Sequence, residues 1–464
     1  MNNQTFRSRI RESIQNETLQ TALDNNTERR LRGKALAFES IPDWRERRQR
    51  AHRIRADVID HLDKYLDQFI SNAQANGIIV HRAKDANEAI EIVLEISKSI
   101  TNHQLPNTLV AKSKSMVSEE IELNHTLEKH GINVVETDLG EYIVQLRKEK
   151  PSHLITPAAH LKKEQVAQLF HEKLGIPYTE DIPTLTATAR KVLREVFLTA
   201  DIGISGVNFG VAETGGICIV TNEGNGRMVT SIPKTHIALM GIERIAPNLN
   251  DLALLLSLLP RSATGQKLTV YTQLIHKPMP GQTRHIILLD NGRTRVRNSP
   301  LKESLYCIRC GACLNVCPIF RNVGGHTYGT VYGGPIGSVI TPHLRGLQDW
   351  KHLSYASSLC GACTETCPVK IDLHHHLLQN RRNASAPATG KPSWWHKLAF
   401  KVFAPIANQP ALWSLTTKLG RFGQKFHGLI KGSRLDPAQA WTKTRELPPV
   451  AKQSFREWWK ERER

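Results

Sequence analysis

The sequence has no long apolar run. Its longest one, from about Leu252 to Leu259, is far shorter than the roughly 18 residues that a membrane-spanning helix needs. The first residues, Met1 to Arg9, contain no apolar core of a secretory signal peptide. We therefore expect a cytoplasmic protein that is at most peripheral to the inner face of the membrane.

Cysteine is scarce outside one stretch of the chain. Seven of the eight cysteines lie between Cys307 and Cys367. The eighth, Cys218, lies in an apolar strand-like run, where we expect an inert buried thiol. Disulfide frameworks are typical of small secreted chains, and a chain of 464 residues with no signal peptide is not one. The seven clustered thiols therefore indicate a metal site in a reducing compartment.

The seven thiols form two runs with one spacing. The first run consists of Cys307, Cys310, Cys313 and Cys317, followed by Pro318. The second run consists of Cys360, Cys363 and Cys367, followed by Pro368. This is the spacing of bacterial [4Fe–4S] proteins, in which a tight loop supplies several thiolates to one compact cluster. In the second run, Ser357 stands where the first cysteine would be.

The fourth cysteine of such a run binds the other cluster in two-cluster ferredoxins. On that rule the ligands of the first [4Fe–4S] cluster are Cys307, Cys310, Cys313 and Cys367. The ligands of the second cluster are Cys317, Cys360 and Cys363. The second cluster therefore has one iron without a cysteine ligand, which we call the open corner. Three outcomes are possible there: ligation by Ser357, a [4Fe–4S] cluster completed by another side chain or water, or loss of the corner iron to give [3Fe–4S]. A serine hydroxyl is a hard, weakly acidic ligand, so we rank Ser357 ligation below an open or exogenously filled corner.

Zinc is the main alternative for these thiols. Structural zinc usually takes four ligands in two pairs separated by a spacer. Neither the fused four-cysteine run nor the proline behind it is needed for zinc. The spacing therefore favours iron–sulfur clusters.

Positive charge is concentrated in the C-terminal tail. The formal net charge is +19, and residues 381–464 contain 17 Lys and Arg residues against five Asp and Glu residues, together with six of the eight tryptophans. The run from Trp394 to Phe403 mixes aromatic and basic residues, which suits an anionic membrane surface or a partner groove. An ordinary packed helix is the alternative. Because no nucleic-acid-binding motif is present, we expect no nucleic-acid partner.

Four segments follow from the pattern along the chain. Residues 1–70 read as charged helices, for which we favour solvated faces over docking to a partner subunit. Residues 71–295 alternate strand-like and helical runs, which predicts an α/β domain with a parallel sheet. The strand-like runs are 78–81, 108–111, 133–136, 268–271 and 285–290, and the helical ones 86–100, 115–129, 162–174, 186–198 and 250–259. Residues 296–382 form the iron–sulfur domain, and residues 383–464 a basic, Trp-rich extension.

Two glycine-rich segments have open interpretations. From Gly203 to Arg227, tight turns flank an apolar strand; we favour a hairpin over an anion site, and Glu213 and Glu223 are either site carboxylates or surface residues. The segment from Gly324 to Pro342 either wraps a cluster or is an ordinary loop. The run His374 to His376 resembles a metal-binding tract but is predicted to be a solvated helix face.

Several motifs together resemble the bacterial lactate utilisation protein B family. They are the two cysteine runs, Gly324-Gly-His-x-Tyr-Gly-x-Val-Tyr-x-Gly-Pro-Ile-Gly337 and Ala212-Glu-Thr-Gly-Gly216. The resemblance covers nearly the whole chain. It implies a lactate-utilisation domain of the sugar-isomerase/CoA-transferase-like α/β type, an α-helical two-cluster ferredoxin-like domain and a C-terminal extension. It also implies that the seven cysteines hold two [4Fe–4S] clusters. It assigns no catalytic residue in the α/β domain.

The leading functional hypothesis is an electron-transfer subunit of a complex that oxidises L-lactate to pyruvate, as the resemblance implies, together with two companion proteins. No Gly-x-Gly-x-x-Gly motif follows the first strand of the α/β domain, so the sequence offers no nicotinamide site to accept a hydride. A quinone-linked acceptor at the membrane is compatible with the tail. The alternatives are the iron–sulfur subunit of another flavin-linked dehydrogenase, for glycolate or glycerol phosphate, and a nucleic-acid-binding iron–sulfur protein.

Overall fold

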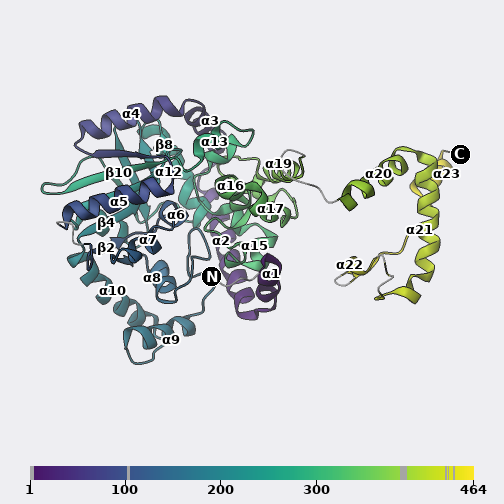
Figure 1. The fold of residues 1–464 in the computed structure, drawn as a ribbon, viewed down its shortest axis with the longest axis horizontal. Coiled ribbons are helices and arrows are strands. Elements are labelled where there is room, and N and C mark those ends of the chain that lie inside the picture. The colour runs from purple at the N-terminus through teal and green to yellow at the C-terminus, as the bar shows by residue number, and fades with distance from the viewer. Residues whose placement is uncertain are drawn as a thin grey trace. The chain divides into compact units, whose positions relative to one another are not determined.

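The computed structural model describes residues 5–101, 105–386, 394–433, 436, 438–442 and 445–463. The chain forms two compact units, Met1–Ala384 and Ser385–Arg464. The first unit has the predicted α/β fold, and the described elements of the second are helices (Figure 1).

A six-stranded parallel sheet is the centre of the first unit. In spatial order its strands are β1 (Ile79–Ala83), β10 (Thr283–Leu289), β7 (Thr235–Gly241), β4 (Ile202–Gly206), β2 (Leu109–Lys112) and β3 (Asn133–Glu136). Ile237 of β7 is in register with Ile204 of β4 and with His285 of β10. A parallel sheet is covered on both faces, and β7 is accordingly buried along its whole length.

Helices cover both faces of this sheet (Figure 1). On one face, α5 (Ala86–Ile100) and α7 (Leu123–Lys129) pack in a core with apolar residues of all six strands. On the other face, α4 (Leu62–Ala75) and α10 (Ile182–Thr199) cover the sheet. The remaining helices of this region are α6 (Met116–Glu120), α8 (Leu139–Leu146), α9 (Lys163–Leu174), α11 (Asn225–Ser231) and α12 (Leu249–Ala263).

Two predicted elements differ from the structure. The predicted helix 115–129 is two helices, α6 and α7, because Glu122 between them has a φ of 53°, which a right-handed helix cannot contain. The predicted strand 268–271 is wrong in position: β9 spans Tyr271–Ile275. By contrast, helix 86–100 and strand 133–136 agree residue for residue.

A second, four-stranded sheet has the order β8 (Ile245–Ala246), β5 (Phe209–Val211), β6 (Gly216–Thr221) and β9. Strands β5 and β6 are antiparallel, which confirms the hairpin predicted for the first glycine-rich segment. At its turn Gly215 has a φ of 67°, and a Cβ there would lie 2.2 Å from the backbone nitrogen of Ala73. Only glycine therefore fits this turn.

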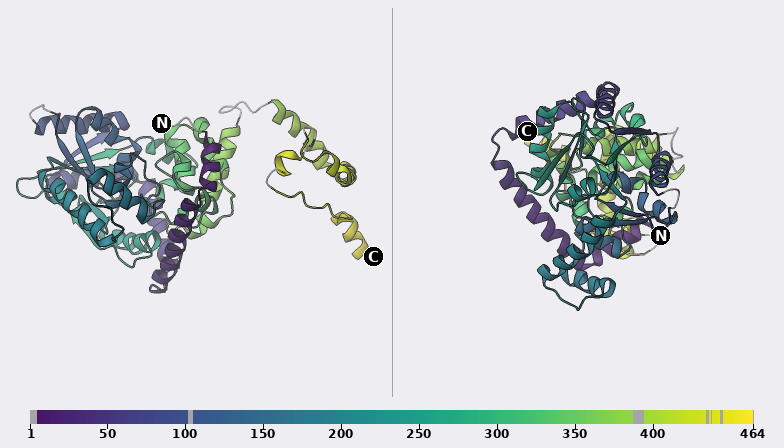
Figure 2. Two further views of the ribbon diagram at one scale, coloured as in Figure 1. Left: turned by 90° about the horizontal axis from the view of Figure 1, so that it is seen from below. Right: turned by 90° about the vertical axis from the view of Figure 1, so that its left-hand side faces the viewer.

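The N-terminal helices are α1 (Phe6–Gln15), α2 (Glu17–Glu39) and α3 (Trp44–Asp60). The prediction that their charged residues form solvated faces is wrong for Arg30 and Arg55, which are buried. Helix α2 contacts α12 and α15, and α3 contacts α12 and η1. These helices thus pack against the cysteine-bearing segment of their own chain (Figure 2).

In the cysteine-bearing segment every regular element that the structure describes is a helix. They are α13 (Arg293–Arg297), η1 (Lys302–Tyr306), α14 (Ala312–Asn315), α15 (Pro318–Val323), η2 (His326–Tyr328), α16 (Gly334–Arg345), α17 (Leu347–Tyr355), α18 (Ala362–Thr366) and α19 (Leu373–Ser385). Their apolar residues share one core with α3 and α12.

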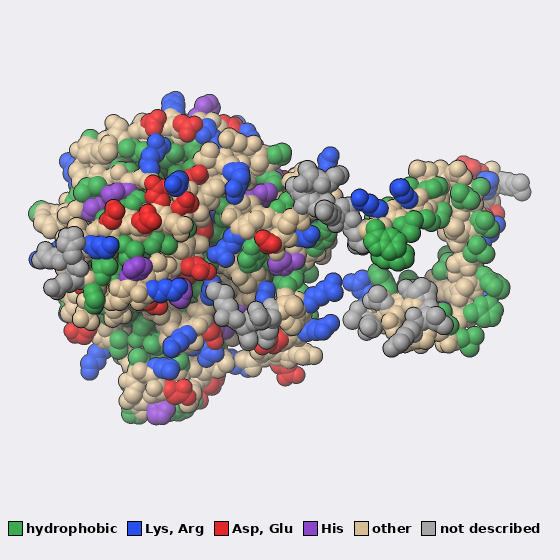
Figure 3. Space-filling view, viewed as in Figure 1, with side chains coloured by type: hydrophobic (Ala, Val, Ile, Leu, Met, Phe, Trp, Pro, Cys, Tyr) green, Lys and Arg blue, Asp and Glu red, His purple; other side chains and the backbone are tan. Residues whose placement is uncertain are grey.

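The second unit consists of α20 (Trp394–Asn408), α21 (Pro410–Ile430), α22 (Gln439–Thr442) and α23 (Phe455–Arg462). Apolar side chains stand exposed along its helices (Figure 3). Over the described parts of the chain, no helix combines the length and apolar character needed to cross a membrane.

Candidate metal centre

The first cysteine run forms a tight loop between η1 and α15. Arg309 and Gly311 have left-handed φ angles of 58° and 72°, which turn the chain twice within three residues. The Arg309 N–H donates a hydrogen bond to Sγ of Cys307 at 3.3 Å, and the Phe320 N–H donates to Sγ of Cys317 at 3.5 Å. Backbone donors directed at sulfur stabilise thiolate charge in iron–sulfur proteins.

The second cysteine run repeats this loop. Leu359 and Gly361 have φ angles of 57° and 82°, at the positions of the two left-handed residues in the first loop. The Leu359 N–H donates to Oγ of Ser357 at 3.1 Å, as the Arg309 N–H donates to Sγ of Cys307. Ser357 therefore occupies the place in its loop that Cys307 occupies in the first.

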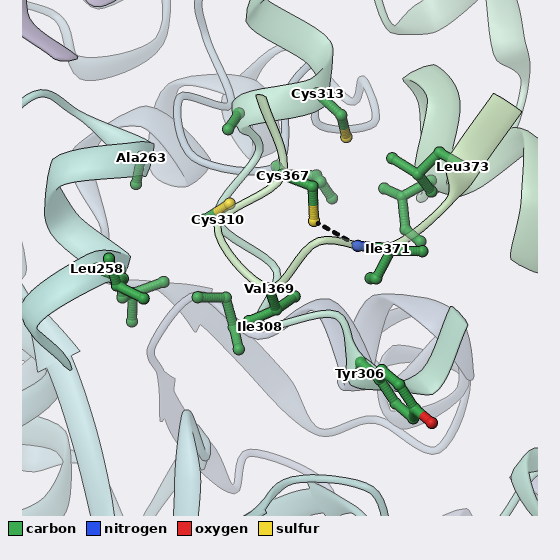
Figure 4. Close-up of a cluster of buried hydrophobic side chains, with 14 of the residues drawn as sticks. Leu258, Ala263, Tyr306, Ile308, Cys310, Cys313, Cys367, Val369, Ile371 and Leu373 are labelled. Atoms are coloured by element: carbon green, nitrogen blue, oxygen red, sulfur yellow. Dashed lines mark hydrogen bonds between the residues drawn. The ribbon is translucent and has the colours of Figure 1, made fainter. Parts of the chain in front are cut away.

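Four thiols gather in the first group. Burial raises the pKa of Cys310 to about 12, and the neighbouring thiols of Cys307 and Cys367 raise it too. Burial also raises the pKa of Cys313 well above its usual value, and the same thiols contribute. Figure 4 shows Cys310, Cys313 and Cys367 together, with Sγ of Cys367 accepting a hydrogen bond from the Ile371 N–H at 3.4 Å.

The other three thiols form a second group. Burial raises the pKa of Cys363 to about 11, and the thiols of Cys317 and Cys360 raise it too. Burial likewise raises the pKa of Cys317, with a contribution from Cys360. Cys360 is exposed, so this group is more open to water than the first. The groups contain the same residues as the two predicted ligand sets, although the ligand assignment itself stays a prediction.

The surroundings of the thiols fit iron–sulfur clusters. Thiolates are soft ligands, which iron–sulfur clusters select. All of the thiols except the exposed Cys360 lie in, or pack against, the apolar core that also contains Leu314 and Ile371. In the second glycine-rich segment, Tyr328 is buried beside Cys313 and Cys317, whose thiols raise its pKa after the larger effect of burial. This segment therefore covers the cysteine loops, which limits water at the sulfurs.

Three family models match the chain in succession. They are the LUD domain at residues 66–291, the 4Fe-4S dicluster domain at 303–371 and the lactate utilisation protein B C-terminal model at 373–464. The lactate utilization protein B of Bacillus thuringiensis (strain Al Hakam) is 42% identical over 465 residues, which cover 98% of this chain and 97% of the relative. The chain belongs to the lactate utilization protein B family.

Lactate utilization protein B of Bacillus cereus (strain AH187) and of Bacillus anthracis (strain A0248) match with the same identity and coverage. No solved structure matches the chain. The likeness to sugar-isomerase/CoA-transferase folds therefore stays a prediction.

Basic residues of the N-terminal helices hold the second cysteine loop. Lys34 of α2 donates to the carbonyl oxygen of Thr366 at 3.0 Å. Arg48 of α3 donates to the carbonyl oxygen of Cys367 at 2.7 Å, and His52 to that of Val369 at 2.9 Å. The charged character of these helices was visible in the sequence, but the partners of the three residues are more than 300 residues away, so spacing gave no signal for them.

A buried ionic network joins the sheet domain to the first cysteine loop. Arg293 contacts Glu243 at 2.6 Å and Glu120 at 2.9 Å. Burial would raise the pKa of Glu243, but Arg293 and Arg309 lower it to about 2. Arg244, the next residue, donates to the carbonyl oxygen of Cys307 at 3.0 Å. The position of the cysteine loop is thus fixed by charges on the sheet domain.

The carboxylates of the first glycine-rich segment have different surroundings. Glu213 is exposed and accepts a hydrogen bond from the Leu249 N–H at 3.1 Å, so it is a surface residue. Glu223 is exposed as well, but it lines a cavity of about 330 Å³ at the carboxyl ends of the parallel strands. Burial raises the pKa of Cys218 to about 12, in agreement with the predicted inert thiol.

The histidine tract of α19 is not one solvated face. His375 is exposed, as predicted, but His376 is buried, and its Nε2 lies 3.0 Å from a carboxylate oxygen of Glu303. His376 therefore links α19 to η1, next to Cys307.

Proposed function

We propose that this protein is the iron–sulfur electron-transfer subunit of a complex that oxidises L-lactate to pyruvate. The observation that carries the proposal is the gathering of seven thiols into two adjacent groups in a chain of the lactate utilization protein B family. The first group would hold one [4Fe–4S] cluster through Cys307, Cys310, Cys313 and Cys367. The second would hold another through Cys317, Cys360 and Cys363.

Iron–sulfur clusters supply one-electron chemistry when bound. The residues of this chain bring the two groups close together, because Cys313 and Cys317 belong to one short loop. Apolar neighbours and the Tyr328 ring limit water at the first group. The exposed Cys360 marks the second group as the side open to solvent. We infer that electrons enter or leave the chain on that side.

Deletion of the gene tests the proposed role. A strain without it, and with no second lactate dehydrogenase, should lose growth on L-lactate and keep growth on glucose. Complementation with the wild-type gene should restore growth, and a gene carrying Cys310→Ala should not. Unimpaired growth of the deletion strain on lactate would refute the role, and loss of growth on glycolate or glycerol phosphate alone would favour another flavin-linked dehydrogenase.

We further propose that the C-terminal unit docks on an anionic membrane surface. In α20 the rings of Trp394 and Trp395 stack with centroids 3.7 Å apart, and both side chains are 62% exposed. Lys397 and Lys401 stand exposed on the same helix. Exposed aromatic rings interleaved with lysines suit the interface of an anionic bilayer, where a quinone could accept electrons.

Co-sedimentation with vesicles tests the docking. Truncation after Asn383, or Lys397→Glu with Lys401→Glu in the full chain, should lower binding to vesicles that contain anionic lipid. The control carries Lys129→Glu and Lys191→Glu, which change the net charge equally at exposed positions of the first unit. Equal binding of all variants would disprove the docking, as would tail-dependent binding to the companion proteins but not to vesicles.

A further inference from the structure

The cavity at the carboxyl ends of the parallel strands lies beside the first cysteine loop. It has a volume of about 330 Å³, at the small end of the range for pockets that bind small molecules. Its walls come from the segments that follow β2, β3 and β4 and from Arg244 and Arg309. The strand order reverses here. From β2 the chain continues to β3 at one edge of the sheet, whereas from β4, the other neighbour of β2, it continues to β7 in the direction of the opposite edge. Such a reversal is where open parallel sheets bind ligands.

Two cationic nitrogens in the cavity lack hydrogen-bond partners, although a second nitrogen of Arg309 lies 3.6 Å from a carboxylate oxygen of Glu243. Nζ of Lys114, just after β2, is buried and has no hydrogen-bond partner among the described residues. The same holds for Nη1 of Arg309, between Cys307 and Cys310. A buried charged donor without an acceptor is costly, because it has given up its water without replacement. Both side chains line the cavity, so an anion bound there would supply the missing acceptor.

The other charges in the cavity restrict the anion to a small net charge. The carboxylates of Asp138, Glu223 and Glu243 line the same space, together with one further cation, Arg244. Although Glu223 is an exposed residue, partial desolvation of its carboxylate raises its pKa to about 7, and the Asp138 charge raises it too. These carboxylates would repel a phosphate dianion more strongly than a monoanion.

Part of the wall is apolar and suits an organic ligand. The apolar lining residues include Met116, Val117, Leu154, Ile155, Ile219 and Leu259. Polar groups stand among them: Asn208 and Thr156 supply an amide and a hydroxyl that can bind a hydroxyl or keto oxygen. An organic acid with a single carboxylate and a neighbouring oxygen therefore fits this wall.

We propose that this cavity is a binding site for a small organic monocarboxylate, held by Lys114 and Arg309 next to the four-thiol group. The choice of a 2-hydroxy or 2-oxo acid, lactate or pyruvate, rests on the proposed function. Arg309 joins the two sites, because its backbone N–H bonds Cys307 while its guanidinium lies in the cavity. A bound acid thus lies beside the place where the first cluster would receive or give up an electron.

Calorimetric titration of the full-length, cluster-loaded protein tests the site under anaerobic conditions. L-Lactate and pyruvate should each bind saturably with one site per chain, and inorganic phosphate should bind more weakly. Lys114→Met should weaken lactate binding about tenfold or more, the effect of losing one charged hydrogen bond. Lys129→Met, at an exposed lysine of α7, should leave it unchanged.

A second variant and a second readout separate binding from misfolding. Val117→Phe fills the cavity without removing a charge and should also weaken binding, while iron content and circular dichroism match the wild type. Bound pyruvate should shift the paramagnetic resonance of the reduced first cluster in the wild type and not in Lys114→Met. No binding of either acid, tighter binding of phosphate, or equal lactate affinity in Lys114→Met would overturn the proposal.

The titration needs no companion protein, so its failure is distinguishable from failure of the proposed function. If lactate reduces the assembled complex but neither acid binds this chain alone, the cavity proposal fails and the function stands. If the acids bind but lactate never reduces the complex, the cavity proposal stands and the function fails.

Discussion

Ser357 and Cys307 differ in one atom and occupy the same place in two repeated loops. The backbone N–H two residues ahead donates to Oγ of Ser357 as its counterpart donates to Sγ of Cys307. A hydroxyl must lose its proton to bind iron and is a harder ligand than thiolate, so the corner at Ser357 is the weak one. Brief exposure to air should therefore produce a [3Fe–4S] paramagnetic resonance signal from the second cluster only.

Ser357→Cys should suppress that signal, because it supplies the missing thiolate. Cys307→Ser is the matched control, since it replaces sulfur by oxygen at the corresponding position of the first loop. It should make one iron of the first cluster labile as well. An air-induced signal that persists in Ser357→Cys but disappears in Cys307→Ser would place the weak corner in the first cluster instead.

Arg293 is the residue on which the buried ionic network depends. It pairs with Glu120 and Glu243, and all three side chains are almost fully buried. Arg293→Met would leave two buried carboxylates without their partner, which should lower the free energy of unfolding by about 3–5 kcal/mol. Urea unfolding of the cluster-loaded protein measures this loss.

Arg297→Met is the control for that measurement. Arg297 pairs with Asp63, which is 78% exposed, so its loss should cost about 1 kcal/mol or less. Equal destabilisation by the two substitutions would show that the network does not join the domains as we describe.

The sequence predicted the thiols but not the charges around them. Cysteine ligands come from short loops, so their spacing is visible in a stretch of a few residues. Lys114, Arg55 and Glu243 could not be predicted, because each meets its surroundings through contacts between distant segments. For the charged N-terminal helices we predicted solvated faces, so the buried partners of these residues were missed.

Helices α2 and α3 hold the second cysteine loop in place through hydrogen bonds to its backbone, an arrangement that we call the clamp. Arg48 donates to the carbonyl oxygens of Glu365 and Cys367, and Cys367 belongs to the first thiol group. Arg48→Ala should therefore loosen the loop and speed the loss of iron to a chelator several-fold, whereas the exposed Arg53→Ala on the same helix should not. Identical rates of iron release in the two variants would contradict the clamp.

At the level of elements, periodicity located the strands and helices of the sheet domain well, since a buried parallel strand is a short apolar run bounded by turns. It failed at Glu122, where one left-handed residue breaks a continuous helical pattern. The four-segment division of the chain stays a prediction. The structure shows one compact unit through Ala384, because α2 and α3 pack into the cysteine-bearing segment.

At the scale of the whole molecule, one chain carries three features that the proposed function uses: the cavity proposed for an organic acid, two adjacent thiol groups and a basic aromatic tail. The cavity touches the first thiol group through Arg309, and the second thiol group is open to solvent. On the proposed function, electrons would pass from a substrate in the cavity through the first thiol group to the second, within the first unit.

The most direct test is to purify the protein anaerobically with its companion proteins and to add candidate substrates while recording paramagnetic resonance. We expect that L-lactate produces the signals of reduced clusters, that glycolate and glycerol phosphate do not, and that Cys310→Ala abolishes the signal of the first cluster. Clusters that stay oxidised with L-lactate but become reduced with another 2-hydroxy acid or with glycerol phosphate would contradict the proposed function.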